Sequence, residues 1–430
     1  MEVRIEDLAH DGRGIGHVAG KAVFVHGALP GELVKPTRVH QGRQYDEARE
    51  CEVLEASPDR VSPQCPHIEQ CSGCSLQHFA PAGQIRAKQK MLADQLSRIG
   101  GVEPEEWLAP LQREAWAYRR KARLSVRYVE KKGRALVGFR EDNGRYVADL
   151  SRCEVLDARV GPLLSTLADL VTGLDSRRDI PQIEMAAAER VVLVLRHLKP
   201  LSAADRARLS EFGVRHGIDW VLQPAGLDSL RTLDDAPPAA LHYELPQYQL
   251  RFAYQPLDFV QVHATLNQAM IDQAMHWLAP QPGERVLDLY CGLGNFTLPI
   301  ARLGAQVLGV EGDAGLVARA RAGALANGLA EVEFIQADLY GEGLGAAPFL
   351  KQAYDKLLLD PPRAGAESVL QHLPGAQARR IVYVSCHPGT LARDTRILIE
   401  RHGFRLRAAG VMDMFPHTTH VESMAVFVRD

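Results

Sequence analysis

Short apolar segments recur through the C-terminal part of the chain, and each ends in a polar residue. Stretches of helical character separate them. Strands as apolar as these are typical of a parallel sheet that helices cover on both faces. The pattern therefore predicts a βαβ domain over residues 256–430, with strands at 285–290, 305–311, 332–338, 355–360 and 380–385.

The rest of the chain has different patterns. Residues 1–58 form short apolar runs broken by glycine turns, which predicts a small β-barrel of about five strands. Residues 59–80 show little periodicity, and a helix with one apolar side is expected near residues 84–100. From 115 to 255, strand-like and helix-like segments alternate. We expect three domains, with the helix near 84–100 packing on the last of them: 1–58, 59–255 and 256–430.

Composition and charge narrow the class of protein. The 430 residues are 46% hydrophobic and 24% charged, and the net charge is −3, so the overall charge does not indicate a nucleic-acid partner. No apolar run approaches the roughly 18 residues that span a bilayer. The first residues, MEVRIEDLAHDGRG, are charged where a secretory signal is apolar. We therefore expect a cytoplasmic protein that has no membrane partner and works as a monomer.

A glycine-bearing turn follows the first strand of the βαβ domain. In VLDLYCGLGNFTLPIA (286–301), Gly292 and Gly294 let the backbone approach a ligand, and the following helix offers free N–H groups. The next strand ends in Glu311, which suits the hydroxyls of a ribose, and the third ends in Asp338, which suits an adenine amino group. This set favours S-adenosylmethionine over NAD, because the full G-x-G-x-x-G fingerprint is missing. The alternative is that both acids are helix caps.

A cysteine follows the fifth strand. In VYVSCHPGTLARD, Cys386 lies at the carboxyl edge of the sheet, where open α/β sheets bind ligands, and Asp360 follows the fourth strand at the same edge. His417, His420 and Glu422 precede the last expected strand. A thiolate, a base and a methyl donor at one edge favour methylation of uracil at C5. The thiolate adds to C6, C5 takes the methyl group, and a base removes the C5 proton. A cysteine that only fills space is the alternative.

Four cysteines form a candidate metal site. Cys65, Cys71 and Cys74 are spaced C-x₅-C-x₂-C, and Cys153 is the fourth. Four thiolates suit zinc or a [4Fe–4S] cluster, although zinc sites more often pair two C-x₂-C units. His67 ranks below Cys153 as a ligand. The two cysteines without partners in this scheme are expected to pack in the interior: Cys51 and Cys291.

A basic stretch lies in the central part of the chain. YRRKARLSVRYVEKKGR (118–134) holds eight Lys or Arg residues and one Glu, with two tyrosines among them. Positive charge beside aromatic rings fits phosphate contact and base stacking. A solvated hairpin face is the alternative. The residues predicted to contact RNA are Arg119, Arg120, Lys121, Arg123 and Arg127.

Four segments together resemble the RNA uracil-C5 methyltransferase family: SCHPGTLARD, DMFPHTTHVESM, DLYCGLGNF and LLLDPPRAG. The resemblance covers the whole chain and is best with the members that modify uracil-1939 of 23S ribosomal RNA. It implies an S-adenosylmethionine-dependent enzyme of three parts. These are an N-terminal TRAM barrel of the oligonucleotide-binding type, a central α/β domain with a [4Fe–4S] cluster, and a C-terminal Rossmann-like class I methyltransferase domain.

The resemblance also implies roles for single residues. Cys386 is implied as the nucleophile and Glu422 as the proton-abstracting base. The iron–sulfur ligands are implied to be the four cysteines at positions 65, 71, 74 and 153. The pocket for the cofactor and the uracil is implied to include Gln261, Tyr290, Asn295, Glu311, Asp338 and Asp360.

Two positions depart from the family pattern. His387 stands where asparagine usually follows the nucleophile, and His263 stands where asparagine usually follows two residues after Gln261. Neither change removes a group that the mechanism requires. Three other functions stay open: the same chemistry at another rRNA or tRNA uracil, a non-catalytic RNA-binding iron–sulfur protein, and an amino-methyltransferase that uses DPPR as others use DPPY. The intact Cys386 and Glu422 count against the second, and Cys386 with Arg363 against the third.

Overall fold

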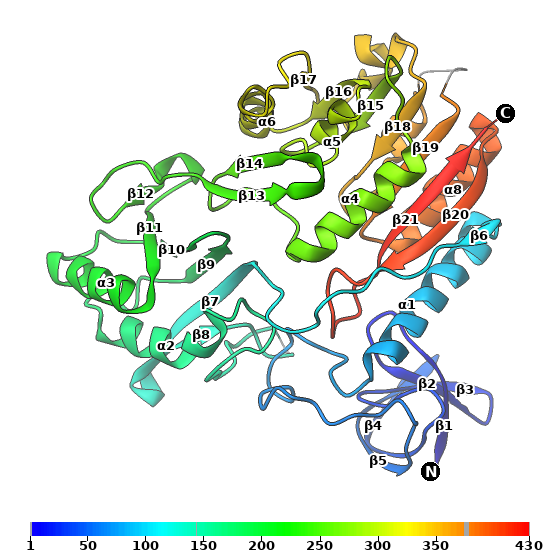
Figure 1. The fold of residues 1–430 in the computed structure, drawn as a ribbon. Helices are drawn as coiled ribbons and strands as arrows, with labels where there is room; N and C mark the ends of the chain where they lie inside the picture. The colour runs from blue at the N-terminus through cyan, green and yellow to red at the C-terminus, as the bar shows by residue number, and fades with distance from the viewer. Residues whose placement is uncertain (1, 143, 374–377, 430) are drawn as a thin grey trace.

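The computed structural model describes residues 2–142, 144–373 and 378–429. The described chain builds a closed barrel, a six-stranded sheet, a two-stranded sheet and an eight-stranded sheet. In Figure 1 the barrel (blue) lies below the eight-stranded sheet, and the six-stranded sheet lies to the left of both. Helix α1 (Pro81–Gln95) runs from the barrel toward the eight-stranded sheet.

The N-terminal barrel has the strand order β1-β2-β3-β5-β4, which confirms the predicted barrel. Val3, Ile5, Val23 and Val25 fill its interior, because successive side chains of a strand point to opposite faces. Strands β1 and β2 approach closely only because residue 16 is glycine: a Cβ there would come within 2.4 Å of the carbonyl oxygen of Arg4. The strands are β1 (Val3–Leu8), β2 (Gly14–Val18), β3 (Lys21–Val25), β4 (Leu33–Gln41) and β5 (Tyr45–Glu55).

The central sheet has the order β12-β11-β10-β9-β7-β8 and is antiparallel except for the pair β10–β11. Helices α2 (Leu164–Gly173) and α3 (Ala203–His216) pack their leucines against one face of it. This part is therefore a mixed α/β unit. Its strands are β7 (Lys121–Val129), β8 (Arg134–Gly138), β9 (Gln182–Ala187), β10 (Val191–Arg196), β11 (Ile218–Gln223) and β12 (Arg231–Thr232).

The eight-stranded sheet carries the predicted βαβ pattern in the order β17-β16-β15-β18-β19-β21-β20-β6. Strands β15 to β19 are parallel, and β21 runs antiparallel between β19 and β20. Apolar clusters cover both faces, as expected of a Rossmann-like domain. The strands are β15 (Arg285–Leu289), β16 (Gln306–Glu311), β17 (Glu333–Gln336), β18 (Lys356–Leu359), β19 (Arg380–Ser385), β20 (Arg405–Met412) and β21 (Glu422–Val428). The helices are α4 (Ala264–Leu278), α5 (Thr297–Arg302), α6 (Ala314–Ala326), α7 (Glu367–Leu370) and α8 (Pro388–His402).

Residues from before the central sheet complete the eight-stranded sheet. Strand β6 (Glu106–Trp107) pairs with β20 at its edge. Leu92 of α1 and Leu96, in the π-helical turn that follows it, lie in the apolar cluster on one face. The two-stranded sheet, β13 (Leu241–Leu245) and β14 (Leu250–Tyr254), packs in the cluster on the other face. Segments on both sides of the central sheet in sequence thus pack against the same eight-stranded sheet, on opposite faces. The domain boundaries at 58 and 255 stay predictions.

Candidate active site and cysteine pocket

A cavity of about 620 Å³ opens at the carboxyl ends of the parallel strands. Its volume lies in the range of small-molecule sites, roughly 300–1,000 Å³. Among the predicted site residues, Gly294 does not line the cavity; its φ of +85° instead shapes the turn between β15 and α5. The predicted residues that do line it are Gln261, Tyr290, Gly292, Asn295, Glu311, Asp338, Asp360, Cys386 and Glu422.

Backbone groups hold the acidic side chain on the cofactor side of the cavity. Glu311, at the end of β16, accepts hydrogen bonds from the N–H groups of Gly292 (3.0 Å), Gly312 (2.7 Å) and Asp313 (3.0 Å). The cap of α6 is Asp313, which accepts from the N–H of Leu316 at 2.8 Å. Glu311 is therefore not a helix cap, and it stands at the edge of the glycine turn where a ribose fits.

Asn295 and Asp338 flank the same side of the cavity. The Asn295 amide exchanges hydrogen bonds with that of Asn267 (2.9 and 3.2 Å), and its Oδ1 also accepts from the hydroxyl of Tyr243 at 2.9 Å. Asp338 accepts from the N–H of Tyr340 at 2.9 Å. These contacts fix both side chains before any ligand arrives, which is how a site becomes preorganised.

Cys386 follows β19 directly and precedes α8, and it is half-buried. Burial raises the pKa of its thiol to about 12, with further increases from Glu422 and Asp360, while Arg363 lowers it. The position at the start of a helix favours a thiolate, because the free N–H groups of the first turn carry partial positive charge. In the ligand-free protein burial outweighs that effect, and the thiol holds its proton at neutral pH.

Two carboxyl groups share the cavity with the thiol. Burial raises the pKa of Glu422 to about 8, with a further increase from Asp360, while Lys88 and Arg363 lower it. Burial also raises the pKa of Asp360 to about 7. Among the described residues that line the cavity, these three weak acids face a single cation, Arg363. Such a site favours a cationic ligand, because a positive charge stabilises every anionic form at once.

The two histidines near Glu422 differ in position. His420 lines the cavity, and burial with the charges of Arg363 and Lys88 lowers its pKa, so it is neutral at neutral pH. His417 is buried away from the cavity, where its ring stacks on Trp116 with centroids 4.0 Å apart. Of the two histidines, which could in principle replace Glu422 as the base, only His420 lies within the pocket.

The two histidines that depart from the family pattern both cap helices. His387 Nδ1 accepts from the N–H of Thr390 at 3.2 Å, at the start of α8. His263 caps α4 by accepting from the N–H of Leu266 at 3.5 Å, and its Nε2 lies 2.9 Å from the carbonyl oxygen of Glu114. Asparagine is a common N-cap residue, so each histidine serves the local role that asparagine can serve.

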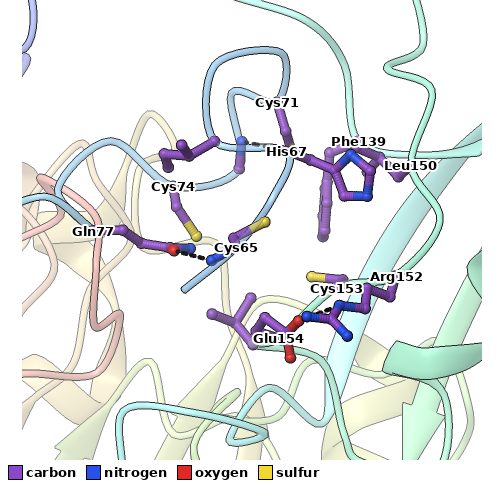
Figure 2. Close-up of a pocket in the computed structure, with 13 residues that line it drawn as sticks. Cys65, His67, Cys71, Cys74, Gln77, Phe139, Leu150, Arg152, Cys153 and Glu154 are labelled. Atoms are coloured by element: carbon purple, nitrogen blue, oxygen red, sulfur yellow. Dashed lines mark hydrogen bonds and ion pairs between the residues drawn. The ribbon is translucent and has the colours of Figure 1, made fainter. Parts of the chain in front are cut away.

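The four predicted metal-site cysteines line one small pocket (Figure 2). Three come from residues 65–74, and the fourth, Cys153, comes from a loop beyond β8. Backbone N–H groups point at the sulfurs of Cys71, from Gly73 at 3.4 Å, and of Cys153, from Val155 and Leu156. Such donors stabilise thiolates, so the chemistry of the donor set fits a thiolate-bound cluster.

Three further observations concern metal binding at this pocket. The Nε2 of His67 accepts from the N–H of Ser151 at 3.1 Å, so that nitrogen is already occupied. Burial raises the pKa of Cys71 to about 11 and of Cys74 to about 12, and the neighbouring cysteines raise both further. Within the described ranges, no three His, Cys, Asp or Glu side chains are arranged to hold a metal ion. The iron–sulfur cluster therefore stays a prediction.

Comparison with known proteins agrees with the geometry of the cavity. The tRNA (Uracil-5-)-methyltransferase family matches residues 241–430, and the TRAM domain matches residues 1–35. Two curated relatives are each 54% identical, over 433 and 435 residues, covering 100% of this chain and 97% of theirs. They come from Stenotrophomonas maltophilia (strain K279a) and Xylella fastidiosa (strain 9a5c), and both are named 23S rRNA (uracil(1939)-C(5))-methyltransferase RlmD. The chain belongs to the RlmD family.

A solved structure supports the fold of this RlmD-family chain. The Pyrococcus abyssi tRNA (uracil-54, C5)-methyltransferase, in complex with S-adenosyl-L-homocysteine, aligns with a TM-score of 0.74 and 23% identity, covering 100% of both chains. The predicted TRAM barrel, class I methyltransferase domain and family resemblance are thereby confirmed. No helix among the described residues is long and apolar enough to cross a membrane.

The basic stretch of this RlmD-family chain lies only partly at the surface. Arg123 and Arg127 are exposed on β7, and Arg119 is half-buried beside the ring of Phe415, which lines the cavity. Arg120 is only 7% exposed, and its Nε donates to the carbonyl oxygen of Gln261 at 2.7 Å. The prediction that Arg120 contacts RNA is wrong, because its guanidinium is used inside the protein.

Lys121 also points inward. Its Nζ donates to the carbonyl oxygen of Pro256, and burial lowers its pKa to about 8. Strand β7 begins at Lys121, where the central sheet meets the segment that carries Gln261. The side chain of Lys121 therefore points toward that segment. A count of positive charges does not reveal this direction, because β7 has one face toward solvent and its first residues have contacts on both sides.

Sequence reasoning missed part of the cavity lining. Arg363, in DPPRAG, is the lining cation, and Tyr340 and Phe415 add aromatic surface. The signal for Arg363 was its position three residues after Asp360 at a strand end. For the two aromatics the sequence has no comparable signal, because both lie in loops whose direction depends on the tertiary structure.

Proposed function

We propose that this protein transfers a methyl group from S-adenosylmethionine to C5 of a uracil in 23S ribosomal RNA, at the position that corresponds to 1939 in its relatives. The observation that carries the proposal is the meeting of Cys386, Glu422 and Asp360 in one cavity with the glycine turn and Glu311. A purely RNA-binding function does not account for a half-buried thiol, a buried carboxyl and a cofactor turn that face each other.

The residues of the cavity divide the work. S-adenosylmethionine supplies an electrophilic methyl group when bound. Cys386 attacks C6 of the uracil, so that the electron pair of the C5–C6 bond moves onto C5 and the carbonyl oxygen, and C5 becomes a nucleophile. After C5 is methylated, Glu422 removes the C5 proton, the C5–C6 double bond re-forms, and the thiolate of Cys386 leaves. The base would have to be flipped out of its RNA stack to reach the cavity.

The pKa values of the cavity connect binding to chemistry. At neutral pH the raised pKa values of Cys386 and Glu422 keep both groups largely protonated in the ligand-free protein. A cation bound beside them lowers both pKa values, because opposite charge within about 4–6 Å favours the ionised form. Arrival of the cofactor would thus activate both the nucleophile and the base, which limits unproductive attack before the methyl donor is present.

A covalent-adduct experiment tests the proposal. RNA with 5-fluorouracil at the target position, incubated with protein and S-adenosylmethionine, should form a stable adduct in a denaturing gel, because fluorine cannot leave as a proton. Cys386→Ala should form no adduct, and Glu422→Gln should accumulate adduct even on unmodified RNA. Cys51→Ala, which changes a half-buried cysteine of the barrel, is the matched control and should behave as the unaltered protein. A normal yield of 5-methyluridine from Cys386→Ala would contradict the mechanism.

We further propose that Cys65, Cys71, Cys74 and Cys153 bind a [4Fe–4S] cluster. The single pocket that they line and the backbone donors aimed at two of the sulfurs support this assignment over a set of unrelated cysteines. Methyl transfer needs no redox step, so the role is structural or RNA-facing. Anaerobic purification should yield a brown protein with visible iron–sulfur absorbance and iron on analysis. A colourless protein that holds zinc would instead support the zinc alternative.

The proposed RNA surface comprises the barrel, the exposed Arg123 and Arg127, and the half-buried Arg119. The charge of these residues supports this surface, as does the contact of Arg119 with the ring of Phe415, which lines the cavity. Substitution of one arginine that binds a phosphate should reduce the slope of log affinity against log salt by about one. Because the substrate is ribosomal RNA, we propose that the protein works in the cytoplasm, as a monomer. Methylation mapped to a different uracil in treated ribosomal RNA would revise the target position.

A further inference from the structure

Two buried polar side chains of α1 face the loop that leads to Glu422. Gln84 and Lys88 are 1% and 2% exposed, and they lie one helical turn apart on the same face of the helix. Both reach the segment Asp413–His417, which precedes β21. A buried polar side chain usually makes hydrogen bonds within the protein, because burial removes its contact with water. Neither residue lines the cavity.

Gln84 holds one end of this loop at His417. Its Oε1 accepts from the N–H of His417 at 2.9 Å, while its Nε2 donates to the carbonyl oxygens of Phe79 (2.7 Å) and Leu76 (3.0 Å). The carbonyl oxygen of His417 accepts from the N–H groups of Ser75 and Leu76, both at 2.9 Å. Gln84 binds the N–H of His417, and the residues that follow Cys74 bind its carbonyl oxygen.

The backbone of His417 explains why such support matters. Its φ of +65° is in the left-handed region, which costs a residue with a Cβ about 1–2 kcal/mol. A strained conformation persists only where its surroundings hold it. Without Gln84 the loop can relax, and the residues that follow it, up to Glu422 at the start of β21, can shift with it.

Lys88 holds the other end of the loop and carries charge. Its Nζ donates to Oδ1 of Asp413 at 2.7 Å and to the carbonyl oxygen of Phe415 at 3.1 Å. A buried ion pair rarely improves stability over apolar residues of similar size, so its retention calls for another reason. The pair therefore ties Asp413 and Phe415 to α1, at the end of the loop opposite His417.

We infer that Gln84 and Lys88 are positioning residues for proton abstraction: together they hold the loop Asp413–His417, which leads to Glu422. The inference rests on the proposed function, in which Glu422 is the base. The loop Asp413–His417 does not carry the nucleophile, because Cys386 lies between β19 and α8. The two residues should therefore affect the release of the methylated product more than the formation of the adduct.

The test measures two steps separately in the full-length protein with S-adenosylmethionine. Adduct formation is followed on 5-fluorouracil RNA, and release of 5-methyluridine product is followed by rapid quench on unmodified RNA between pH 6 and 9.5. Lys88→Met should slow release about tenfold, because it frees the end of the loop at Asp413 and Phe415 and displaces the base that follows. Gln84→Leu should slow release by about the same factor, because it frees the end at His417. Adduct formation should stay within about twofold in both.

A matched control and a second variant keep the test decisive. Lys90→Met makes the same change two residues along α1 at an exposed lysine and should leave both steps unaltered. Lys88→Met leaves Asp413 buried without a partner, so Lys88→Met/Asp413→Leu removes the whole pair if the single variant does not fold. Thermal melting and cofactor titration verify folding. Unchanged release in either folded variant overturns the positioning role of that residue, and an equal loss of adduct formation overturns the assignment to proton abstraction. Failure of the proposed function has a different signature, since the unaltered protein would then form no adduct.

Discussion

The cavity at the sheet edge and the cysteine pocket both gather weak acids whose pKa values burial raises, yet they are built differently. The acids of the cavity lie at strand ends: Asp360 follows β18, Cys386 follows β19 and Glu422 begins β21. Three of the four cysteines lie in residues 56–80, where the structure has neither helix nor strand. The catalytic cavity measures about 620 Å³, whereas the space among the cysteines measures about 20 Å³.

Because they are built differently, the cavity and the cysteine pocket would hold a cationic ligand in different ways. At the sheet edge, packing on both faces fixes the acids before the ligand binds, so binding can serve chemistry. In the cysteine pocket, loops without regular hydrogen bonding approach each other, and a bound cluster would itself hold them together. Binding free energy then becomes folding free energy. We therefore expect changes at the first site to reduce activity and changes at the second to reduce stability.

The largest expected effect contrasts two cysteine substitutions. Cys153→Ser should lower the free energy of unfolding by roughly 3–5 kcal/mol, because it removes one cluster ligand from a loop-built site. Cys386→Ser, the matched change at the sheet edge, should stay within about 1 kcal/mol of the unaltered protein while methylation is lost. Denaturant unfolding under anaerobic conditions measures both. Equal stability of the two variants would remove the contrast between the sites.

A smaller effect is expected where the central sheet supports the catalytic cavity. Arg120→Met removes the bond to the carbonyl oxygen of Gln261 and the contact with the ring of Tyr243, 5.0 Å away. It should cost about 1.5–3 kcal/mol of stability, the usual range for a hydrogen bond to a charged group, and weaken binding of S-adenosylmethionine. Arg123→Met, at an exposed arginine of the adjacent β7, should cost less than about 1 kcal/mol. Thermal melting and calorimetric titration distinguish them, and an equal loss in both would place Arg120 at the surface after all.

The pH dependence of cofactor binding sharpens the comparison further. The folded pKa values of Glu422 and Asp360 lie above their ordinary values, near 8 and 7. Their contribution to stability is therefore full at low pH and is lost as pH rises through 7 and 8. A cation favours the ionised forms, so affinity for S-adenosylmethionine should rise about tenfold between pH 6 and 9. Asp360→Asn should flatten this rise in a calorimetric titration series, whereas an unchanged slope would assign the effect to another group.

The smallest expected effect concerns the histidine next to the nucleophile. His387 caps α8 through a neutral Nδ1, and burial with the charges of Arg363 and His10 lowers its pKa. His387→Ala should cost about 1 kcal/mol through loss of the cap, whereas His387→Asn should restore most of it. Because protonation removes the acceptor, the asparagine variant should keep more of its stability below pH 5 than the unaltered protein. Melting curves at pH 5 and 7 measure this, and identical acid profiles would mean that the cap does not titrate.

Residues at strand ends could be predicted because their position follows from local rules. Parallel strands bring their carboxyl ends to one edge, so Glu311, Asp360 and Cys386 are placed together once five apolar segments are recognised. Glu422 was expected just before the last strand, and its role as the base was implied by the resemblance to the family. The pattern of charges placed Arg120 at the surface. It does not show the direction of a side chain at a point where two sheets meet, and there the structure turns Arg120 inward.

By itself the sequence determined the barrel, the βαβ order, the strand-end acids and the position of Cys386 among them, because each depends on periodicity or on chain order within a few residues. Only the tertiary structure decided that β6 joins the catalytic sheet, that Arg120 supports Gln261, and that Gln84 and Lys88 face the loop before Glu422. These contacts join residues more than 100 positions apart. Their partners are selected by the packing of whole elements, a property that no local pattern encodes.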